Sequence, residues 1–102
     1  MPPEDYRFVV NLGDLMEVWS IDRYKAAAHR VLPVPSGTSR YSMPFFYSPG
    51  YRAVIEPIVS DEAPHYRPFT WYEFAKARTD DNYENKGVPD TQVTDYRCAV
   101  AN

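Results

Sequence analysis

Three residues stand out for their chemistry: His29, Arg40 and Ser42. The sequence from Tyr24 to Leu32 alternates in a way that predicts a strand, and in an extended chain His29 shares a face with Ala27 and Val31. A neutral imidazole beside such small neighbours is a good ligand for a first-row metal. The alternative interpretation is a core histidine hydrogen-bonded to the backbone.

Arg40 and Ser42 lie two positions apart in a second predicted strand, 40–47, so their side chains project to the same side. A guanidinium fork with a nearby hydroxyl is a suitable receptor for a carboxylate, because the fork offers two parallel charge-assisted hydrogen bonds. The alternative is an edge-strand arginine in solvent. The segment PVPSGTS between the two strands has turn chemistry and predicts a hairpin. Since adjacent strands lie roughly 5 Å apart, a metal at His29 and a dicarboxylate reaching Arg40 are geometrically compatible.

The other polar candidates have simpler interpretations. His65 lies between prolines and is expected in an exposed loop, and Asp14 is expected to cap the turn at Gly13. The acidic pair 61–62 lacks the spacing of a calcium loop and is interpreted as solvated charge. Cys98 has no evident activating base and is expected to be inert.

Size and charge restrict the classes of partner. The chain has 102 residues, enough for one small domain, and a net charge of −3. Without a basic surface, nucleic acid is not expected as a partner. The apolar runs are too short for a membrane span, and the N-terminus lacks the pattern of a signal peptide. A single cysteine excludes an internal disulfide, so a cytoplasmic location is expected.

The elements that must position these residues are mostly short strands. The apolar patterns predict strands near 8–10, at 15–19 in preference to a helical turn, and at 24–32, 40–47 and 53–59. Thr70 and Glu73 form a capping-box pattern that predicts a helix from about Trp71 to Asp80. We therefore divide the chain into a β-rich part at 1–69, a helix at 70–81 and a loose polar tail at 82–102.

The segments VNLGDLMEVWS, RYKAAAHRV, RYSMPFF and AVIEP together resemble the C-terminal half of the catalytic core of the isopenicillin N synthase-like Fe(II)/2-oxoglutarate-dependent dioxygenases. The resemblance runs from about Phe8 to Ile58 and more weakly through TWYEFAKAR. Its combination of Asn-x-Gly-Asp, Tyr-Lys-x-x-x-His-Arg-Val and Arg-x-Ser follows the family's order and spacing. The segment Ser20–Arg23 departs from the Asn-Gly that many members carry there.

This resemblance implies a mainly β fold, a partial double-stranded β-helix or jelly roll with a C-terminal helix. It implies that His29 is one iron ligand of a 2-His-1-carboxylate triad, and that Arg40 and Ser42 hold the distal carboxylate of 2-oxoglutarate. The implied cofactors are Fe(II) and 2-oxoglutarate, with ascorbate as an alternative. The implied reaction uses molecular oxygen to hydroxylate, desaturate or cyclise a small organic substrate.

The family's other two iron ligands form a His-x-Asp motif, and neither histidine of this sequence is followed by that pattern. We therefore interpret the chain as a C-terminal portion of a longer oxygenase, which by itself is expected to be inactive. A second interpretation is a non-enzymatic remnant that acts through association with itself or another polypeptide. A third is a free-standing ligand-binding β-sandwich, which would leave the order of His29, Arg40 and Ser42 unexplained.

Overall fold

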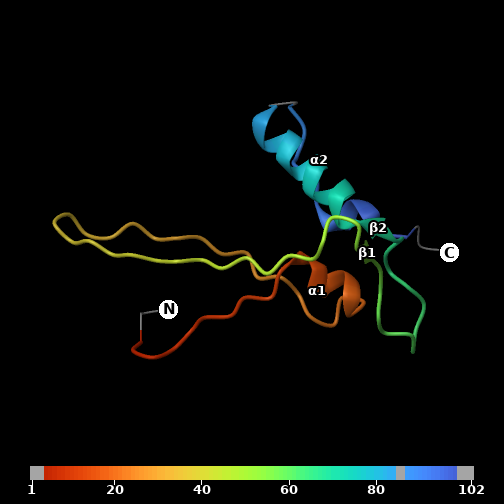
Figure 1. The fold of residues 1–102 in the computed structure, drawn as a ribbon, viewed down its shortest axis with the longest axis horizontal. Helices are drawn as coiled ribbons and strands as arrows, with labels where there is room; N and C mark the ends of the chain where they lie inside the picture. Colours follow the sequence, from red (N-terminus) through yellow and green to blue (C-terminus); the bar gives the residue numbers. More distant parts are fainter. Residues whose placement is uncertain (1–3, 85–86, 99–102) are drawn as a thin grey trace.

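The computed structural model describes residues 4–84 and 87–98. In chain order its elements are helix α1 (Asp14–Trp19), strand β1 (Val54–Ile55), strand β2 (Phe69–Thr70), helix α2 (Trp71–Tyr83) and the 3-10 helix η1 (Val93–Tyr96). The two strands pair antiparallel, with Val54 opposite Thr70. A small body contains all five elements, and a long hairpin projects from it (Figure 1).

The core of the body is formed by side chains from every element. Its buried members come from α1, β1, β2, α2, η1 and the segment before β2: Val18, Ile55, Tyr66, Phe69, Phe74, Val93 and Tyr96. Aromatic rings dominate it, and the Phe69 and Tyr96 rings stack with centroids 4.1 Å apart. Burial of each such side chain contributes about 1.5–3 kcal/mol to folding, relative to leaving it exposed. The cluster therefore holds together segments that are far apart in the sequence.

The segment 15–19, predicted as a strand, is part of helix α1, so that prediction was wrong. Leu15, Val18 and Trp19 recur at helical spacing, and all three pack on the core. Ser20 ends the helix, and its hydroxyl donates to the Met16 carbonyl over 2.6 Å. The core lies on one side of this segment only. A helix directs all three apolar side chains to that side, whereas an extended chain would direct them to both.

The segments 24–32 and 40–47, predicted as strands, are extended but form no strand within the described part of the chain. They are the two arms of the hairpin, which turns where the Thr38 amide donates to the Pro35 carbonyl over 3.1 Å. Four prolines in or beside the arms lack the amide a ladder needs: Pro33, Pro35, Pro44 and Pro49. The predicted strand 53–59 is similarly reduced to β1.

The predicted helix is confirmed as α2. Thr70 is its N-cap, and its hydroxyl oxygen accepts from the Glu73 amide over 3.1 Å. This satisfies one of the amides that the first turn leaves without an intrahelical partner. Neither helix, nor η1, is long and apolar enough to cross a bilayer within the described residues.

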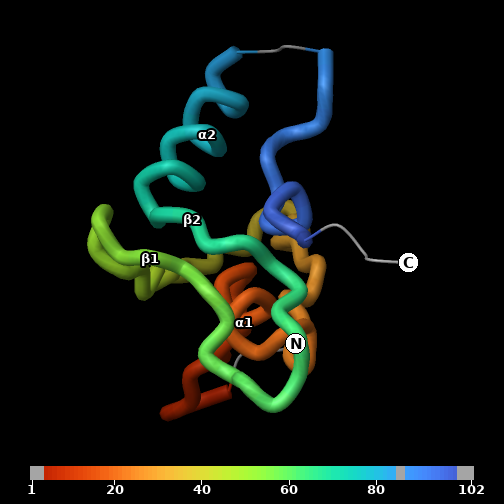
Figure 2. Tube along the Cα trace, turned by 90° about the vertical axis from the view of Figure 1, so that its right-hand side faces the viewer, coloured from red at the N-terminus to blue at the C-terminus, as the bar shows by residue number. Residues whose placement is uncertain are grey.

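The expected loose tail at 82–102 differs in its described part. After α2 the chain returns along the helix and forms η1 (Figure 2), which inserts Val93 and Tyr96 into the core. Gln92 and Asp95 cap η1 reciprocally. The polar composition of this segment gave no sign that two of its side chains are buried. The domain boundary at residue 82 remains a prediction.

Candidate functional site

The hairpin arm that carries His29 begins just after α1, and its first residues, 24–26, which we call the arm root, are hydrogen-bonded to the helix. The Tyr24 amide donates to the Ser20 hydroxyl over 3.0 Å, and the Ala26 amide donates to the Glu17 carboxylate over 2.9 Å. Both acceptors lie on or at the end of α1. Alternate residues of the arm are therefore tied to the helix, which sets the direction in which the chain runs toward His29.

His29 itself is exposed, and its Nδ1 lies 2.9 Å from the carbonyl oxygen of Ala27. A carbonyl can only accept, so Nδ1 carries the proton in this contact. The lone pair then lies on Nε2, the arrangement that a backbone carbonyl imposes on many metal-ligating histidines. The core-histidine alternative is partly right, because the ring bonds the backbone, and partly wrong, because the ring is not buried.

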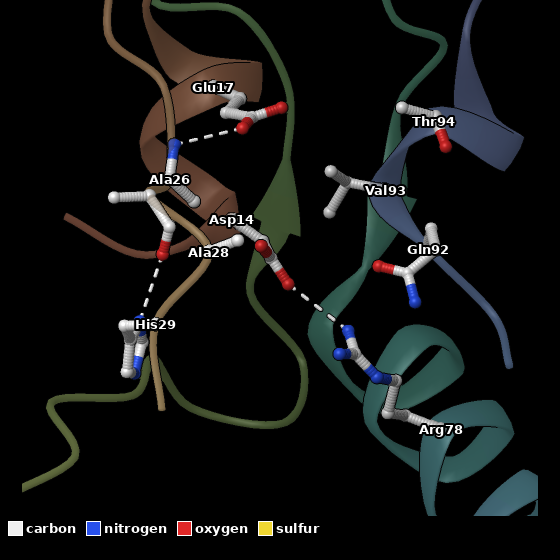
Figure 3. Close-up of a pocket in the computed structure, with 10 residues that line it drawn as sticks. Asp14, Glu17, Ala26, Ala28, His29, Arg78, Gln92, Val93 and Thr94 are labelled. Atoms are coloured by element: carbon white, nitrogen blue, oxygen red, sulfur yellow. Dashed lines mark hydrogen bonds and ion pairs between the residues drawn. The ribbon is translucent and has the colours of Figure 1, made fainter. Parts of the chain in front are cut away.

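A groove of about 570 Å³ lies between this arm and the C-terminal elements. Figure 3 shows α1 and the arm on one side and α2 with η1 on the other. Its lining residues are Asp14, Glu17, Ala26, Ala27, Ala28, His29, Arg78, Gln92, Val93 and Thr94. The groove has both polar and apolar lining, and His29 is one of its lining residues.

An ion pair crosses the groove. The guanidinium of Arg78, on α2, lies 3.1 Å from the carboxylate of Asp14, at the start of α1. Both side chains are about one-third exposed. Asp14 was expected to cap the turn at Gly13; instead, it links the two helices across the groove.

Arg40 and Ser42 lie elsewhere, on the second arm of the hairpin and close to its turn. Both are exposed, and neither belongs to the residues that line the groove. The structure thus brings His29 to a groove and leaves the predicted carboxylate receptor outside it. The roles of His29, Arg40 and Ser42 remain predictions.

The described residues contain possible metal donors, His29 among them, but no complete metal site. Within 4–84 and 87–98 no three His, Cys, Asp or Glu side chains are grouped so as to hold an ion. A facial triad requires three protein ligands around one metal. The donor set present therefore does not fit resident iron without ligands from outside it.

Sequence reasoning missed a cluster centred on Asp22. Its carboxylate accepts from Tyr66 Oη over 2.6 Å, Lys25 Nζ over 2.8 Å and Arg97 Nη2 over 3.0 Å, and its other oxygen lies 3.0 Å from His65 Nδ1. Burial raises the pKa of the Asp22 carboxyl, but these hydrogen bonds and the Arg97 charge outweigh it and hold that pKa well below its usual range. The Asp22 carboxyl is thus ionised at neutral pH.

His65 and Tyr66 were interpreted differently or not at all from the sequence. His65 was expected in an exposed loop, but it is only partly exposed and contacts Asp22. Burial and the hydrogen bond to Asp22 raise the pKa of the Tyr66 hydroxyl, so it stays a proton donor. The one signal in the sequence was the departure of Ser20–Arg23 from the Asn-Gly expected there from the family resemblance.

Comparisons with known proteins agree with the resemblance. A sequence profile described as the 2OG-Fe(II) oxygenase superfamily matches residues 1–49, a range that includes His29, Arg40 and Ser42. The "Gibberellin 2-beta-dioxygenase 5" of Oryza sativa subsp. japonica is 40% identical over 82 residues, which cover 78% of this chain and 24% of that protein. The "1-aminocyclopropane-1-carboxylate oxidase 1" of Cucumis melo is 53% identical over 57 residues, which cover 56% of this chain and 18% of that protein.

The chain thus spans about a quarter, or less, of the length of the curated relatives it matches. No solved structure matches its fold. The sequence likeness includes α1, the arm root and the whole hairpin, the parts of the molecule that carry the three predicted site residues. On these grounds the chain belongs to the 2OG-Fe(II) oxygenase superfamily.

Proposed function

We propose that this chain is the C-terminal part of the core of a non-heme iron, 2-oxoglutarate-dependent oxygenase that oxidises a small organic substrate. The observation that carries the proposal is the superfamily match over residues 1–49, within which His29, Arg40 and Ser42 occur in the family's order. His29 is the proposed iron ligand. Its tautomer supports this role, because the proton on Nδ1 leaves Nε2 able to bind a metal.

Arg40 and Ser42 are the proposed anchors of the cosubstrate. A guanidinium and a hydroxyl two residues apart in an extended chain can both donate to one carboxylate, and the acid end of 2-oxoglutarate is such a group. Ascorbate is the alternative cosubstrate. Bound Fe(II) would supply the activation of molecular oxygen, and the outcome is hydroxylation, desaturation or ring closure.

The proposed fold of the whole oxygenase core is a double-stranded β-helix, in which the two arms of the hairpin become strands of the barrel. The exposed arms support this, because their backbone groups and side chains remain available for further strands. In such a barrel the hairpin would bring Arg40 and His29 to one cavity. The remaining iron ligands would come from residues other than these 102, so we expect the chain alone to oxidise nothing.

A chimera provides the test. Residues 1–58 would replace the matching segment of the rice gibberellin 2-beta-dioxygenase, and oxygen consumption would be measured with Fe(II), 2-oxoglutarate and that enzyme's own substrate. We expect an active chimera that the variants His29→Ala and Arg40→Ala inactivate, and that Arg30→Ala, the matched neighbour of His29, leaves active. An active chimera that retains its rate without the imidazole of His29 would refute the proposal.

Association through the hairpin is a second candidate function, and one observation favours it. Nine large apolar side chains of residues 24–50 are exposed: Tyr24, Val31, Leu32, Val34, Tyr41, Met43, Phe45, Phe46 and Tyr47. A soluble monomer rarely leaves so many large apolar side chains uncovered in one segment. The same segment has three basic residues and no acidic one, whereas the rest of the chain holds all 14 acidic residues. A second copy therefore offers charge complementarity to the hairpin.

For the whole protein we propose a cytoplasmic location, with molecular oxygen and a small molecule as partners and neither nucleic acid nor membrane. The net charge of −3 supports the exclusion of nucleic acid, since binding to phosphates depends on basic side chains. Filter binding of labelled DNA and RNA at low salt would test this exclusion. Binding at micromolar protein would contradict it.

A further inference from the structure

The corner between α1 and the arm has an unusual backbone. Ile21 and Asp22 both adopt left-handed conformations, with φ of 53° and 62°. Such conformations are uncommon outside glycine, and for a β-branched residue they are genuine outliers. Ile21 is also 2% exposed, so its side chain is committed to the interior. Something must hold this corner in a conformation that its residues do not prefer.

The Asp22 carboxylate is placed to hold it. One oxygen accepts from Lys25 Nζ, Tyr66 Oη and Arg97 Nη2, and the other faces His65 Nδ1. These partners come from three segments far apart in the sequence. A carboxylate with several charge-assisted bonds stabilises one backbone geometry more strongly than neutral hydrogen bonds could.

The partners are themselves fixed by backbone pairing. Tyr66 and Arg97 form an isolated antiparallel bridge, with the Arg67 amide donating to the Tyr96 carbonyl and the Cys98 amide donating to the His65 carbonyl, each over 2.8 Å. The Tyr66 ring is buried, and the Arg97 guanidinium lies 5.2 Å from its centroid. Backbone hydrogen bonds and a buried ring therefore fix Tyr66 and Arg97 to the body of the molecule.

The corner in turn determines where the arm goes. Tyr24 and Ala26 follow Asp22 at alternate positions, and their amides bond Ser20 and Glu17 of the α1 region. These two bonds form only if the chain leaves the corner in the observed direction. Three residues beyond Ala26 comes His29, at the edge of the groove.

We propose that Asp22 is a positioning residue: its carboxylate locks the left-handed corner and so holds the arm that carries His29 against α1, with Arg97 as the partner from the C-terminal segment. The residue touches neither a substrate nor a metal and acts through the backbone of the arm. The proposal goes beyond the proposed function, because the position of the arm can be measured whether or not His29 binds iron.

Amide hydrogen exchange of the full chain, followed residue by residue by NMR, is the test. In Asp22→Asn the acceptor oxygen and the tolerance for a left-handed φ remain, while the charge is lost. We expect exchange at Tyr24 and Ala26 to accelerate by about tenfold, the factor that loss of a charge-assisted bond produces. The Trp71 amide, which bonds Ala53 in the body, should change by less than about twofold. Asp80→Asn, which removes an exposed carboxylate from α2, is the matched control and should leave all three amides unchanged.

Arg97→Gln is a milder second variant, for use if Asp22→Asn does not fold. It should accelerate exchange at the same two arm amides, since it removes one of the charged partners of Asp22. Unchanged exchange at Tyr24 and Ala26 would overturn the proposal. Equal acceleration at Trp71 would overturn it as well, because Asp22 would then support only global stability. The readout contains no metal, so a failed iron assay leaves this inference standing, and the reverse also holds.

Discussion

The substitution Tyr66→Phe, which removes one hydroxyl oxygen from the core, should measure how much the Asp22 cluster contributes to the free energy of unfolding. Tyr66 is 1% exposed, and its hydroxyl donates to Asp22 over 2.6 Å while accepting from Arg97 over 3.2 Å. In Tyr66→Phe the ring still fills its place in the core, so no large cavity forms. Two interactions disappear: the hydrogen bond that the hydroxyl donates to the ionised carboxylate, and the longer one that it accepts from Arg97.

The expected size follows from the contacts that remain. Asp22 keeps Lys25, Arg97 and His65 within about 3 Å, so its charge is not left without partners. A hydrogen bond to a charged group contributes about 1.5–3 kcal/mol, and we expect Tyr66→Phe to lower the free energy of unfolding by about 2 kcal/mol. For a chain of this length that is a fall in Tm of roughly 10 °C.

Urea unfolding at pH 7, followed by the fluorescence of Trp19 and Trp71, is the assay. Tyr83→Phe, at a tyrosine that is exposed on α2, is the control and should change the free energy of unfolding by less than about 0.5 kcal/mol. In the double variant with Asp22→Asn the two losses should not add, and the coupling should exceed about 0.5 kcal/mol. A Tyr66→Phe protein as stable as the wild type, or strictly additive losses, would refute the assignment of Asp22 as the centre of the cluster.

Four further results are expected. Burial raises the pKa of the Asp22 carboxyl but its hydrogen bonds lower it more, so its contribution to stability is complete above about pH 4 and is lost as the pH falls through the depressed value; the urea midpoint should therefore fall less between pH 5 and pH 3 in Asp22→Asn than in the wild type. Thr70→Ala removes the N-cap of α2 and should lower the free energy of unfolding by about 1 kcal/mol, measured by urea unfolding, with Thr70→Ser close to wild type. Phe74→Ala opens a cavity among aromatic rings and should cost about 3–5 kcal/mol, enough to abolish the cooperative unfolding transition. If the hairpin associates with a second copy, Phe45→Ser with Phe46→Ser should shift the sedimentation-equilibrium mass toward that of a monomer, and an unchanged mass would exclude these two exposed side chains from the interface.

Local signals were read correctly where the sequence alone sets the chemistry. The Thr70 and Glu73 pattern predicts the start of α2, because capping depends on residues three apart in one turn. The turn after Leu32 was also predicted, since Pro restricts the backbone locally and Gly37 permits the positive φ that the turn uses. The family assignment rests on motifs of the same kind, whose residues and spacing can be read without coordinates.

Predictions failed where distant segments compete for the same residues. Whether Leu15, Val18 and Trp19 form a strand or a helix depends on where the core lies, and both patterns suit these residue types. The burial of Val93 and Tyr96 could not be predicted either, because their polar surroundings suggest a solvated tail. The arms of the hairpin have strand-like sequences but no ladder, since a strand also requires partners that pair with it.

The sequence by itself determined the family, the three residues proposed to bind iron and cosubstrate, and the start of α2, since each depends on residue types at short, fixed spacing. Only the tertiary structure decided that His29 lies at the edge of a groove while Arg40 and Ser42 lie outside it. It alone revealed that Asp22 joins residues 25, 65, 66 and 97 around a left-handed corner. The physical reason is that a carboxylate's partners are selected by distance in space, and residues 22 and 97 become neighbours only when the aromatic core has brought the two ends of the chain together.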